Sequence, residues 1–359
     1  MSSALVVGAT GFVGRHVVWT LLDHGYDVAA ASRGSHVFRF ADPGVEAVTV
    51  DRTDPEALAA VARRVDPDVV VDCAAIHPED VEVGVETFEG VDAYVYVSSG
   101  AAYRGRAIPK REEESPLHEC TPEQAADGSM ASYGPRKAEG DRIVATAAER
   151  GVAATSVRPT VVYGPQITEE RADEAIGTAP WEDGIPASWA PDVSGIQGHH
   201  DYWIDRIRRS DRVVVPGDGT AIWHRAYVED VAEAIRTVAE RGRPGGAYNV
   251  GDRRVCTLED VVVLIAEALD AEVEVVHASR RDLAGVGLSP GEFPLYHHPM
   301  TGYPHVLETC KLASLGWEST GVERAIERTV AECLRSGRPG RVDDPRREAE
   351  ARLLDRLKT

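Results

Sequence analysis

The sequence predicts a doubly wound α/β fold, in which helices cover both faces of a parallel sheet, and three observations support this. Short apolar runs alternate with helical patterns through the first half of the 359-residue chain. The runs are rich in Val and Ala with almost no polar alternation, which is typical of parallel strands buried on both faces. A glycine-rich turn at residues 8–14 separates the first run from the first helical pattern. We expect a smaller C-terminal α/β substrate-binding subdomain.

The predicted elements follow one another in regular alternation. In the first half, strands are expected at Ala4–Val7, Asp27–Ala31, Val45–Val50, Asp68–Ala74, Ala93–Val97 and Ala153–Val157, with helices at Phe12–Asp23, Pro55–Val65, Glu79–Phe88 and about Ala131–Arg150. In the second half, strands are expected at Val213–Val215, Ile222–Val228, Tyr248–Val250 and Glu272–Val276, with helices at Trp203–Arg209, Glu229–Arg241, Leu258–Leu269, Cys310–Leu315, Val322–Arg335 and Arg346–Leu357.

Domain boundaries follow from where this alternation loosens. We expect a nucleotide-binding domain at 1–165, a substrate-binding region at 166–335 and a C-terminal extension at 336–359. Elements at about 220–250 are expected to return to the first domain. Residues 166–202 and 279–305 lack a clear period, and long irregular segments of this kind are usually functional, so we expect them to line the substrate pocket.

Composition restricts the classes of partner. The chain has 59 acidic and 39 basic residues, a formal net charge of −20. Such a surface repels nucleic acid and anionic membranes, so neither is expected as a partner. Only four of the cations are lysines. We favour adaptation to high salt over a GC-rich genome as the explanation, because a GC-rich genome alone does not account for the acid excess.

Other features favour a cytoplasmic protein without metal. No apolar stretch approaches the roughly 20 residues that span a bilayer, and the chain starts directly with a strand pattern rather than a basic leader. The five cysteines include no Cys-x-x-Cys pair, so neither a disulfide framework nor a zinc site is indicated.

The glycine-rich turn predicts a dinucleotide site of the Rossmann type. Gly8 permits a tight turn, Gly11 lets the backbone approach a pyrophosphate, and Gly14 allows close packing of helix on strand. The intervening Thr10, Phe12 and Val13 bring backbone amides to the positive end of the helix, where phosphates are favoured.

The end of the second strand bears on cofactor choice. An acidic residue there would bind the adenosine ribose and repel a 2′-phosphate, but this chain has Ser32 and Arg33. Both can donate hydrogen bonds to a phosphate, which favours NADP over NAD, although Arg33 could instead stack on adenine or point to solvent. Other residues expected at the cofactor follow the third and fourth strands: Asp51, Arg52, Ala74 and Ala75.

A catalytic group is predicted around residue 133. Tyr133 and Lys137 are four residues apart, about one helical turn, so they share a helix face. A nearby ammonium lowers the pKa of a phenol, which otherwise lies near 10, so that it can act as a base. Pro135 suits a first helical turn, which places the start of the helix near Tyr133. Ser99 ends the fifth strand and could orient a substrate hydroxyl, with Ser98 as the alternative.

These motifs together resemble the extended short-chain dehydrogenases, which include the NAD-dependent epimerase/dehydratase family. The resemblance covers about residues 4–335 and adds the segments 157–165, 216–219, 228–232, 248–251 and 315–317. It implies that Lys137 also holds the nicotinamide ribose and that the backbone from Pro159 to Val162 meets the carboxamide. Residues 201–209 are closer to an epimerase-like subgroup similar to chloroplast stem-loop RNA-binding proteins. We also expect a homodimer.

The sequence also departs from the nucleotide-sugar pattern. Near Val161 there is no Asn, and Trp223 stands where these enzymes tend to place a diphosphate-binding Arg. Gly100 and Ala101 replace an acidic pair, which disfavours a 4,6-dehydratase. Candidate pocket residues are His77, Trp181, Trp223, His224, Arg225, Tyr296 and His297.

We therefore expect reversible hydride transfer at a hydroxyl carbon of a sugar or nucleotide sugar, by an epimerase or a dehydrogenase. The alternative is a catalytically idle protein that binds RNA or senses a cofactor. A metal hydrolase built on His199–His200 or His297–His298 is disfavoured, since adjacent histidines lack the spacing of a helical metal pair.

Overall fold

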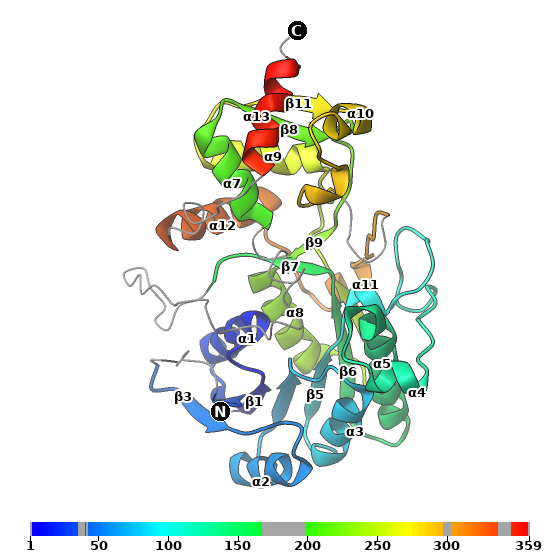
Figure 1. Cartoon of the computed structure of the whole chain (residues 1–359). Coiled ribbons are helices and arrows are strands. Elements are labelled where there is room, and N and C mark those ends of the chain that lie inside the picture. The colour runs from blue at the N-terminus through cyan, green and yellow to red at the C-terminus, as the bar shows by residue number, and fades with distance from the viewer. Residues whose placement is uncertain are drawn as a thin grey trace.

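The computed structural model describes residues 2–34, 40, 42–166, 199–296, 303–336 and 346–357. Figure 1 shows the large sheet with its helices in the lower part of the molecule and a smaller α/β lobe, containing the C-terminal helix, above it.

The large sheet has seven parallel strands in the order β10-β6-β5-β4-β1-β2-β3. Their bounds are Ser3–Val7 (β1), Asp27–Ser32 (β2), Val45–Thr49 (β3), Val69–Asp72 (β4), Ala93–Val97 (β5), Ala154–Pro159 (β6) and Ala247–Val250 (β10). The order reverses between β1 and β4, and ligands of doubly wound sheets bind in the crevice at that switch point. The predicted doubly wound α/β fold is confirmed.

Successive residues of each strand face opposite sides of the sheet, and each side has its own core. Val6 and Val95 pack toward α1 (Phe12–Asp23) and α8 (Val228–Arg241). Leu5 and Tyr94 pack on the other side, which is covered by helices α2 (Pro55–Val65), α3 (Pro78–Thr87) and α5 (Tyr133–Glu149). Burial on both faces explains why the strands carry no polar alternation.

The second lobe has a parallel pair of strands, β8 (Arg212–Pro216) and β11 (Glu274–Ala278). Its larger helices are α7 (His199–Arg209), α9 (Leu258–Ala268), α12 (Val322–Ser336) and α13 (Arg346–Arg356). Trp203, Ile265, Ile326 and Leu353 belong to one buried core, so the last helix is packed into this lobe. Strand β7 (Val161–Tyr163) pairs with β9 (Arg225–Tyr227). Two short helices are α4 (Pro122–Ala126) and α11 (Cys310–Ala313).

Several elements differ from the sequence-based expectation: β7 and α4 were not expected, and α7 and β11 have other bounds. Three further differences have a local explanation. Strand β4 stops at Asp72 because the carboxylate of that residue accepts the amide hydrogens of Ala74 and Ala75 and turns the chain. The strand expected from Ile222 is shorter, since Ile222 forms an isolated bridge with Thr257 instead. The segment from 279, expected to be irregular, contains a short helix, α10 (Arg280–Ala284), which begins with a capping box formed by Ser279 and Asp282.

No helix in the described ranges combines the length and apolar character needed to cross a membrane.

Candidate active site

The glycine turn has the shape that a dinucleotide requires. Gly8 adopts φ +82°, and a Cβ at Gly14 would lie 2.2 Å from the carbonyl oxygen of Gly8. Gly8 also packs against Ala74, where an added Cβ would meet that of the alanine at 3.0 Å. Helix α1 begins at Phe12 without a side-chain cap from Gly11, so the amides of its first turn can receive a phosphate. The turn therefore fits NAD(P).

The turn after β4 connects this loop to the catalytic candidates. Buried Asp72 accepts hydrogen bonds from the amides of Ala74 and Ala75 at 3.0 and 2.9 Å. The guanidinium of Arg52 pairs with Asp72 at 2.6 Å and with Asp80 at 2.9 Å. Arg52, predicted at the cofactor, thus has its side chain committed to an ion pair that fixes this turn.

Lys137 lies in the first turns of α5 with its ammonium enclosed between two strand ends. Its Nζ donates to the carbonyl oxygens of Ala75 and Val97 at 2.8 and 2.9 Å. Burial lowers the pKa of Lys137 to about 8, although the negative charges of Asp72 and Asp141 oppose that shift. The amine is therefore still mostly protonated at neutral pH.

Tyr133 opens helix α5, and its ring centroid is 5.8 Å from the Lys137 ammonium. Burial raises the pKa of Tyr133, while a hydrogen bond with the Ser99 side chain and the charge of Arg136 lower it. The Ser99 hydroxyl also accepts the Ala101 amide hydrogen at 3.1 Å. The structure thus brings Ser99, Tyr133 and Lys137 together at the carboxyl ends of β4 and β5.

Ser98 points elsewhere. Its hydroxyl is buried and lies 3.5 Å from the carbonyl oxygen of Lys137, inside the helix–sheet contact. Ser99 is only partly buried and reaches Tyr133. The extended backbone at Ser99, followed by the short 3₁₀ helix Gly100–Ala102, produces this difference.

Most of the remaining cofactor candidates lie at or after the carboxyl ends of strands in the large sheet. Ser32 ends β2, and the exposed Arg33 follows it. Asp51 is held by Thr53, whose hydrogen bonds lower its pKa, and Arg33 and Arg52 add a further lowering. Positions Thr10, Phe12 and Val13 surround the start of α1, while Pro159 ends β6 and Val162 lies in β7.

His305 is a residue near the site that the sequence did not indicate. Its Nε2 donates to the carbonyl oxygen of Gly100 at 2.9 Å, directly after Ser99. A Cβ at Gly100 would meet Leu307 at 3.0 Å. The segment around His305 therefore packs on the turn that carries Ser99. No local motif predicts this contact, because it joins residues 205 positions apart.

The candidate pocket residues fall in different places. Trp223, His224 and Arg225 are buried, and Arg225 contacts His200 at 2.7 Å and lies over the ring of Tyr163. His77 is the N-cap residue just before α3, and its Nδ1 donates to the carbonyl oxygen of Ala125. Tyr296 lies near Gly217. Trp181 and His297 lie outside the described residues, as do His298 and the side chain of His199.

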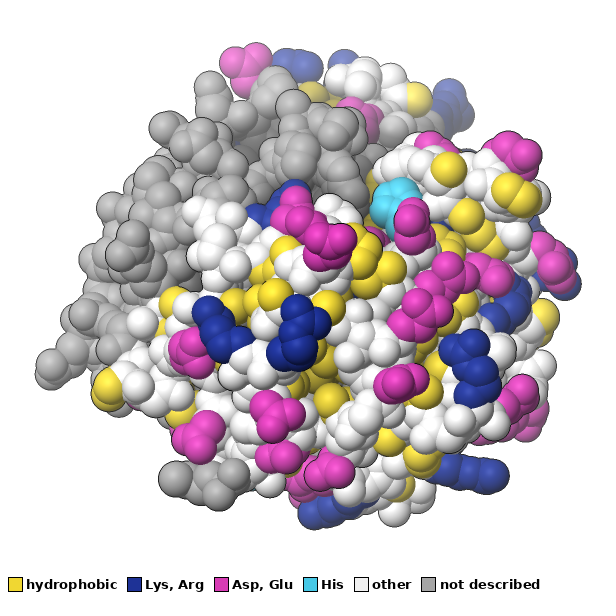
Figure 2. All heavy atoms as spheres, turned by 90° about the horizontal axis from the view of Figure 1, so that it is seen from below, with side chains coloured by type: hydrophobic (Ala, Val, Ile, Leu, Met, Phe, Trp, Pro, Cys, Tyr) yellow, Lys and Arg dark blue, Asp and Glu magenta, His cyan; other side chains and the backbone are white. Residues whose placement is uncertain are grey.

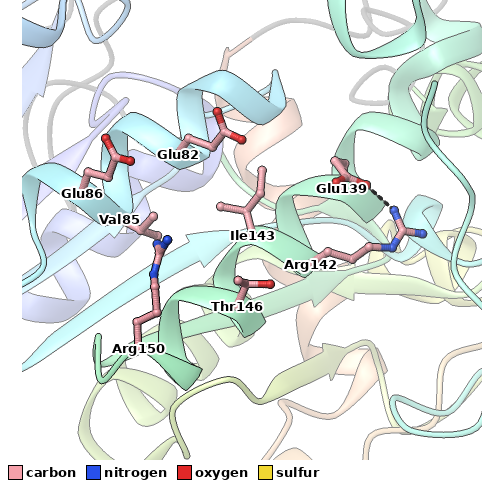
Figure 3. A pocket seen from close by; sticks show the side chains of 8 residues that line it. All are labelled: Glu82, Val85, Glu86, Glu139, Arg142, Ile143, Thr146 and Arg150. Carbon is pink, nitrogen blue, oxygen red and sulfur yellow. Dashed lines mark hydrogen bonds and ion pairs between the residues drawn. The ribbon is translucent and has the colours of Figure 1, made fainter. Parts of the chain in front are cut away.

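A hollow of about 190 Å³ lies between the outer faces of α3 and α5 (Figure 3). Its lining is largely charged, and in Figure 3 Arg142 pairs with Glu139 while Arg150 stands at the far end of α5. The lining includes none of Ser99, Tyr133 and Lys137. This hollow is therefore not the catalytic crevice.

Comparison with known proteins agrees with the fold. The model of the NAD dependent epimerase/dehydratase family matches residues 4–179 and 193–251. Among solved structures, a UDP-glucose 4-epimerase of Thermotoga maritima has a TM-score of 0.64 at 21% identity, covering 93% of this chain and 99% of its own. A dTDP-glucose 4,6-dehydratase of Bacillus anthracis in complex with NAD has a TM-score of 0.62 at 19% identity. This match covers 94% of this chain and 98% of the dehydratase.

Curated relatives cover different chemistries. A 2′-dehydrokanamycin reductase of Streptomyces kanamyceticus is 28% identical over 67% of this chain, and the match spans 59% of the reductase. A dTDP-glucose 4,6-dehydratase of Streptomyces griseus is 25% identical over 75% of this chain and 79% of its own. A chloroplast stem-loop binding protein of 41 kDa from Arabidopsis thaliana is 22% identical, and the match covers 77% of this chain and 66% of the chloroplast protein.

Proposed function

The chain belongs to the NAD-dependent epimerase/dehydratase family, and from this premise we propose that it catalyses reversible hydride transfer at a hydroxyl carbon of a sugar or nucleotide sugar. One observation carries the proposal. A hydroxyl (Ser99), a phenol (Tyr133) and an ammonium (Lys137) converge beside a glycine turn that fits a dinucleotide. The turn after β4 connects the glycine turn to the catalytic side chains. Gly8 packs on Ala74 of this turn, and the Lys137 ammonium donates to the carbonyl oxygen of Ala75.

Each group has a distinct role in this proposal. When bound, NAD(P) supplies the hydride acceptor or donor. Tyr133 takes the proton of the substrate hydroxyl during oxidation and returns it during reduction. Ser99 orients the reacting oxygen toward the phenol. Lys137 supplies positive charge near the phenol and donates hydrogen bonds to the cofactor ribose.

We further propose that the chain prefers NADP to NAD. The proposal is supported by Ser32 and the exposed Arg33 at the end of β2, where an acidic residue would repel a 2′-phosphate. The amide of Gly34 lies 3.4 Å from the Ser32 hydroxyl oxygen, which remains able to donate its own hydrogen. Titrating the purified protein with both cofactors tests this, and tighter binding of NAD would overturn it.

RNA binding is the competing function, and the similarity to a chloroplast stem-loop binding protein is the observation that favours it. The net charge of −20 opposes it. On the face shown in Figure 2, acidic side chains are dispersed among the basic ones. Filter binding of stem-loop RNA over a salt series separates the alternatives. Micromolar binding at physiological salt, with no turnover of any sugar, would favour the RNA-binding function.

A cytoplasmic location, a homodimer and salt adaptation remain predictions. Light scattering after size exclusion reports the oligomer. Unfolding midpoints in a potassium chloride series report salt adaptation, and we expect the midpoint to rise with salt because screening weakens repulsion among carboxylates.

Replacement of Tyr133 by Phe tests the proposed function directly. The variant keeps the ring but loses the proton-transfer group, so we expect turnover of a responsive sugar substrate to fall by roughly 10²–10⁴-fold. Substrates are first found by thermal shift and cofactor absorbance at 340 nm over a panel of sugars and nucleotide sugars. The dissociation constant for NAD(P) should stay unchanged. A fully active Tyr133→Phe variant would exclude this mechanism.

A further inference from the structure

We infer that Arg52 is a positioning residue for the proposed site. It bridges the carboxylates of Asp72 and Asp80, and these two carboxylates fix residues 74–77, the segment between β4 and α3. That segment contacts both Lys137 and the glycine turn. The inference rests on the proposed function, in which Lys137 and the glycine turn bind NAD(P).

The first argument is how residues 74–77 are held. Asp72 accepts the amide hydrogens of the first two residues of this segment, at 3.0 and 2.9 Å. Asp80 accepts those of the last two, both at 2.9 Å. Backbone amides in a buried turn require acceptors, and here two carboxylates supply them for four consecutive residues. The conformation of the segment therefore depends on where these carboxylates stand.

The second argument is what keeps the two carboxylates in place. Arg52 Nη2 donates to the carboxylate of Asp72 at 2.6 Å and to the backbone carbonyl oxygen of Asp80 at 2.7 Å. Arg52 Nη1 pairs with the carboxylate of Asp80 at 2.9 Å. Arg52 and Asp72 are buried. A planar guanidinium can serve two such acceptors at once, and without it two negative charges would face each other out of water.

The third argument is where the bridge lies in the sheet. Arg52 belongs to the connection between β3 and α2, whereas Asp72 ends β4. In the sheet, β1 and β2 separate these two strands, and the glycine turn follows β1. The ion pair therefore joins chain segments from the two sides of the glycine turn. Because its guanidinium is committed to these bonds, we place Arg52 behind the cofactor site rather than in contact with the cofactor.

The fourth argument is what the held segment touches. The carbonyl oxygen of Ala75 accepts a hydrogen bond from Lys137 Nζ at 2.8 Å. At the preceding residue, the Cβ of Ala74 would lie 3.0 Å from a Cβ added at Gly8. Since these contacts are made by adjacent residues, a displaced segment would move the ammonium and the glycine turn together. Small misplacements of such groups weaken binding and catalysis.

Two measurements without substrate test the inference. The chain has four lysines, so [15Nζ]lysine labelling gives few NMR signals, and the one lost in Lys137→Arg identifies Lys137. Hydrogen exchange of that ammonium reports how firmly the strand ends enclose it. We expect Arg52→Gln to speed this exchange about tenfold, because the enclosing segment opens more readily. The dissociation constant for NAD(P) should rise about fivefold, because binding must then order the segment.

Two control variants separate position from charge and from stability. Arg64→Gln makes the same substitution at an exposed cation in the last turn of α2, which pairs with Glu46. Glu350→Gln breaks a buried ion pair in the other lobe, so it lowers stability without touching residues 74–77. Both controls should leave the exchange of Lys137 and the affinity for NAD(P) unchanged.

The inference requires both changes in Arg52→Gln. Wild-type exchange or wild-type cofactor affinity in the folded variant would overturn it, as would equal changes in Glu350→Gln. If Arg52→Gln does not fold, Arg52→Lys decides, because one ammonium cannot bridge two carboxylates as a planar fork does. Wild-type values in Arg52→Lys would then overturn the inference. The turnover of Tyr133→Phe reports the proposed function separately, since neither measurement here uses a substrate.

Discussion

The catalytic end of the large sheet and the C-terminal lobe use buried polar side chains in different proportions. At the sheet, several such groups bind backbone: Lys137 donates to strand-end carbonyls, and Asp72, which also pairs with Arg52, accepts amides of the following turn. In the lobe, buried charges bind one another. Arg206 of α7 pairs with Glu350 of α13 at 2.8 Å, and Arg347 pairs with Asp205 at 2.8 Å.

This difference separates function from stability. Side chains bound to strand-end backbone hold a fixed framework while leaving a hydroxyl and a phenol at the crevice. Side chains that neutralise each other leave no group for a ligand and instead join distant segments of the chain. We therefore expect substitutions in the first region to change catalysis and substitutions in the second to change stability.

The largest expected effect is on stability, in the lobe. Glu350→Gln leaves Arg206 with less negative charge in a buried site where Tyr202 also donates to Glu350 at 2.8 Å. Breaking a buried pair costs about 3 kcal/mol. Urea unfolding measures the loss, and the cofactor dissociation constant should not change. Glu348→Gln, an exposed position on the same helix, is the control. Equal stabilities of the two variants would contradict the structural role of the pair.

The next effect is on catalysis, at the sheet. Ser99→Ala removes the hydroxyl that contacts Tyr133, and we expect kcat to fall by about 100-fold, as for loss of one donor in an active site. The melting temperature should fall slightly, because the Ser99 hydroxyl also accepts the Ala101 amide. Ser98→Ala is the control, with kcat within about threefold of wild type. If kcat falls more in Ser98→Ala than in Ser99→Ala, the roles assigned to the two serines are reversed.

The same contrast explains what could be predicted from the sequence. The strands, the glycine turn and the Tyr133–Lys137 pair follow from local spacing, because periodicity and one helical turn fix which residues share a face. The sequence places Ser98 and Ser99 at the same strand end, with Ser98 as the alternative, whereas in the structure the Ser99 side chain reaches Tyr133 and the Ser98 hydroxyl lies near the Lys137 carbonyl.

Long-range contacts could not be predicted. Arg52 and Arg225 are cations near expected ligand sites, yet their partners, Asp72 and His200, are 20 and 25 residues away in sequence. A charged residue after a strand looks the same in sequence whether it binds a ligand or a buried carboxylate. His305 was missed for the same reason, since only the folded chain places it on Gly100.

His305, which packs on the turn that carries Ser99, gives a pH-dependent prediction. Burial lowers its pKa to about 4, and the charges of Lys110 and His118 add to this, although the bond to Gly100 opposes it. The unfolded chain binds a proton near pH 6.5. The stability contributed by neutral His305 is therefore complete above pH 6.5 and is lost as pH falls toward 4, by up to about 1.4 kcal/mol per pH unit. His305→Gln should flatten the dependence of unfolding free energy on pH by that amount.

Unfolding midpoints at half-unit pH steps measure this slope for wild type and variant. His24→Gln, at an exposed position after α1, should keep the wild-type slope. A variant at 305 with the wild-type slope would show that the imidazole is not held neutral by burial.

The smallest expected effect concerns cofactor choice, where an exposed side chain contributes least. Arg33→Gln removes the cation at the end of β2, and an exposed charge pair is worth about 1 kcal/mol, so NADP affinity should fall about fivefold. NAD affinity should change less than twofold, because NAD carries no 2′-phosphate. Isothermal titration with both cofactors measures this, and Arg63→Gln, exposed on α2, controls for net charge. If the affinities for NADP and NAD fall equally, Arg33 contacts a part that both cofactors share, such as adenine. Other residues would then discriminate between the two cofactors.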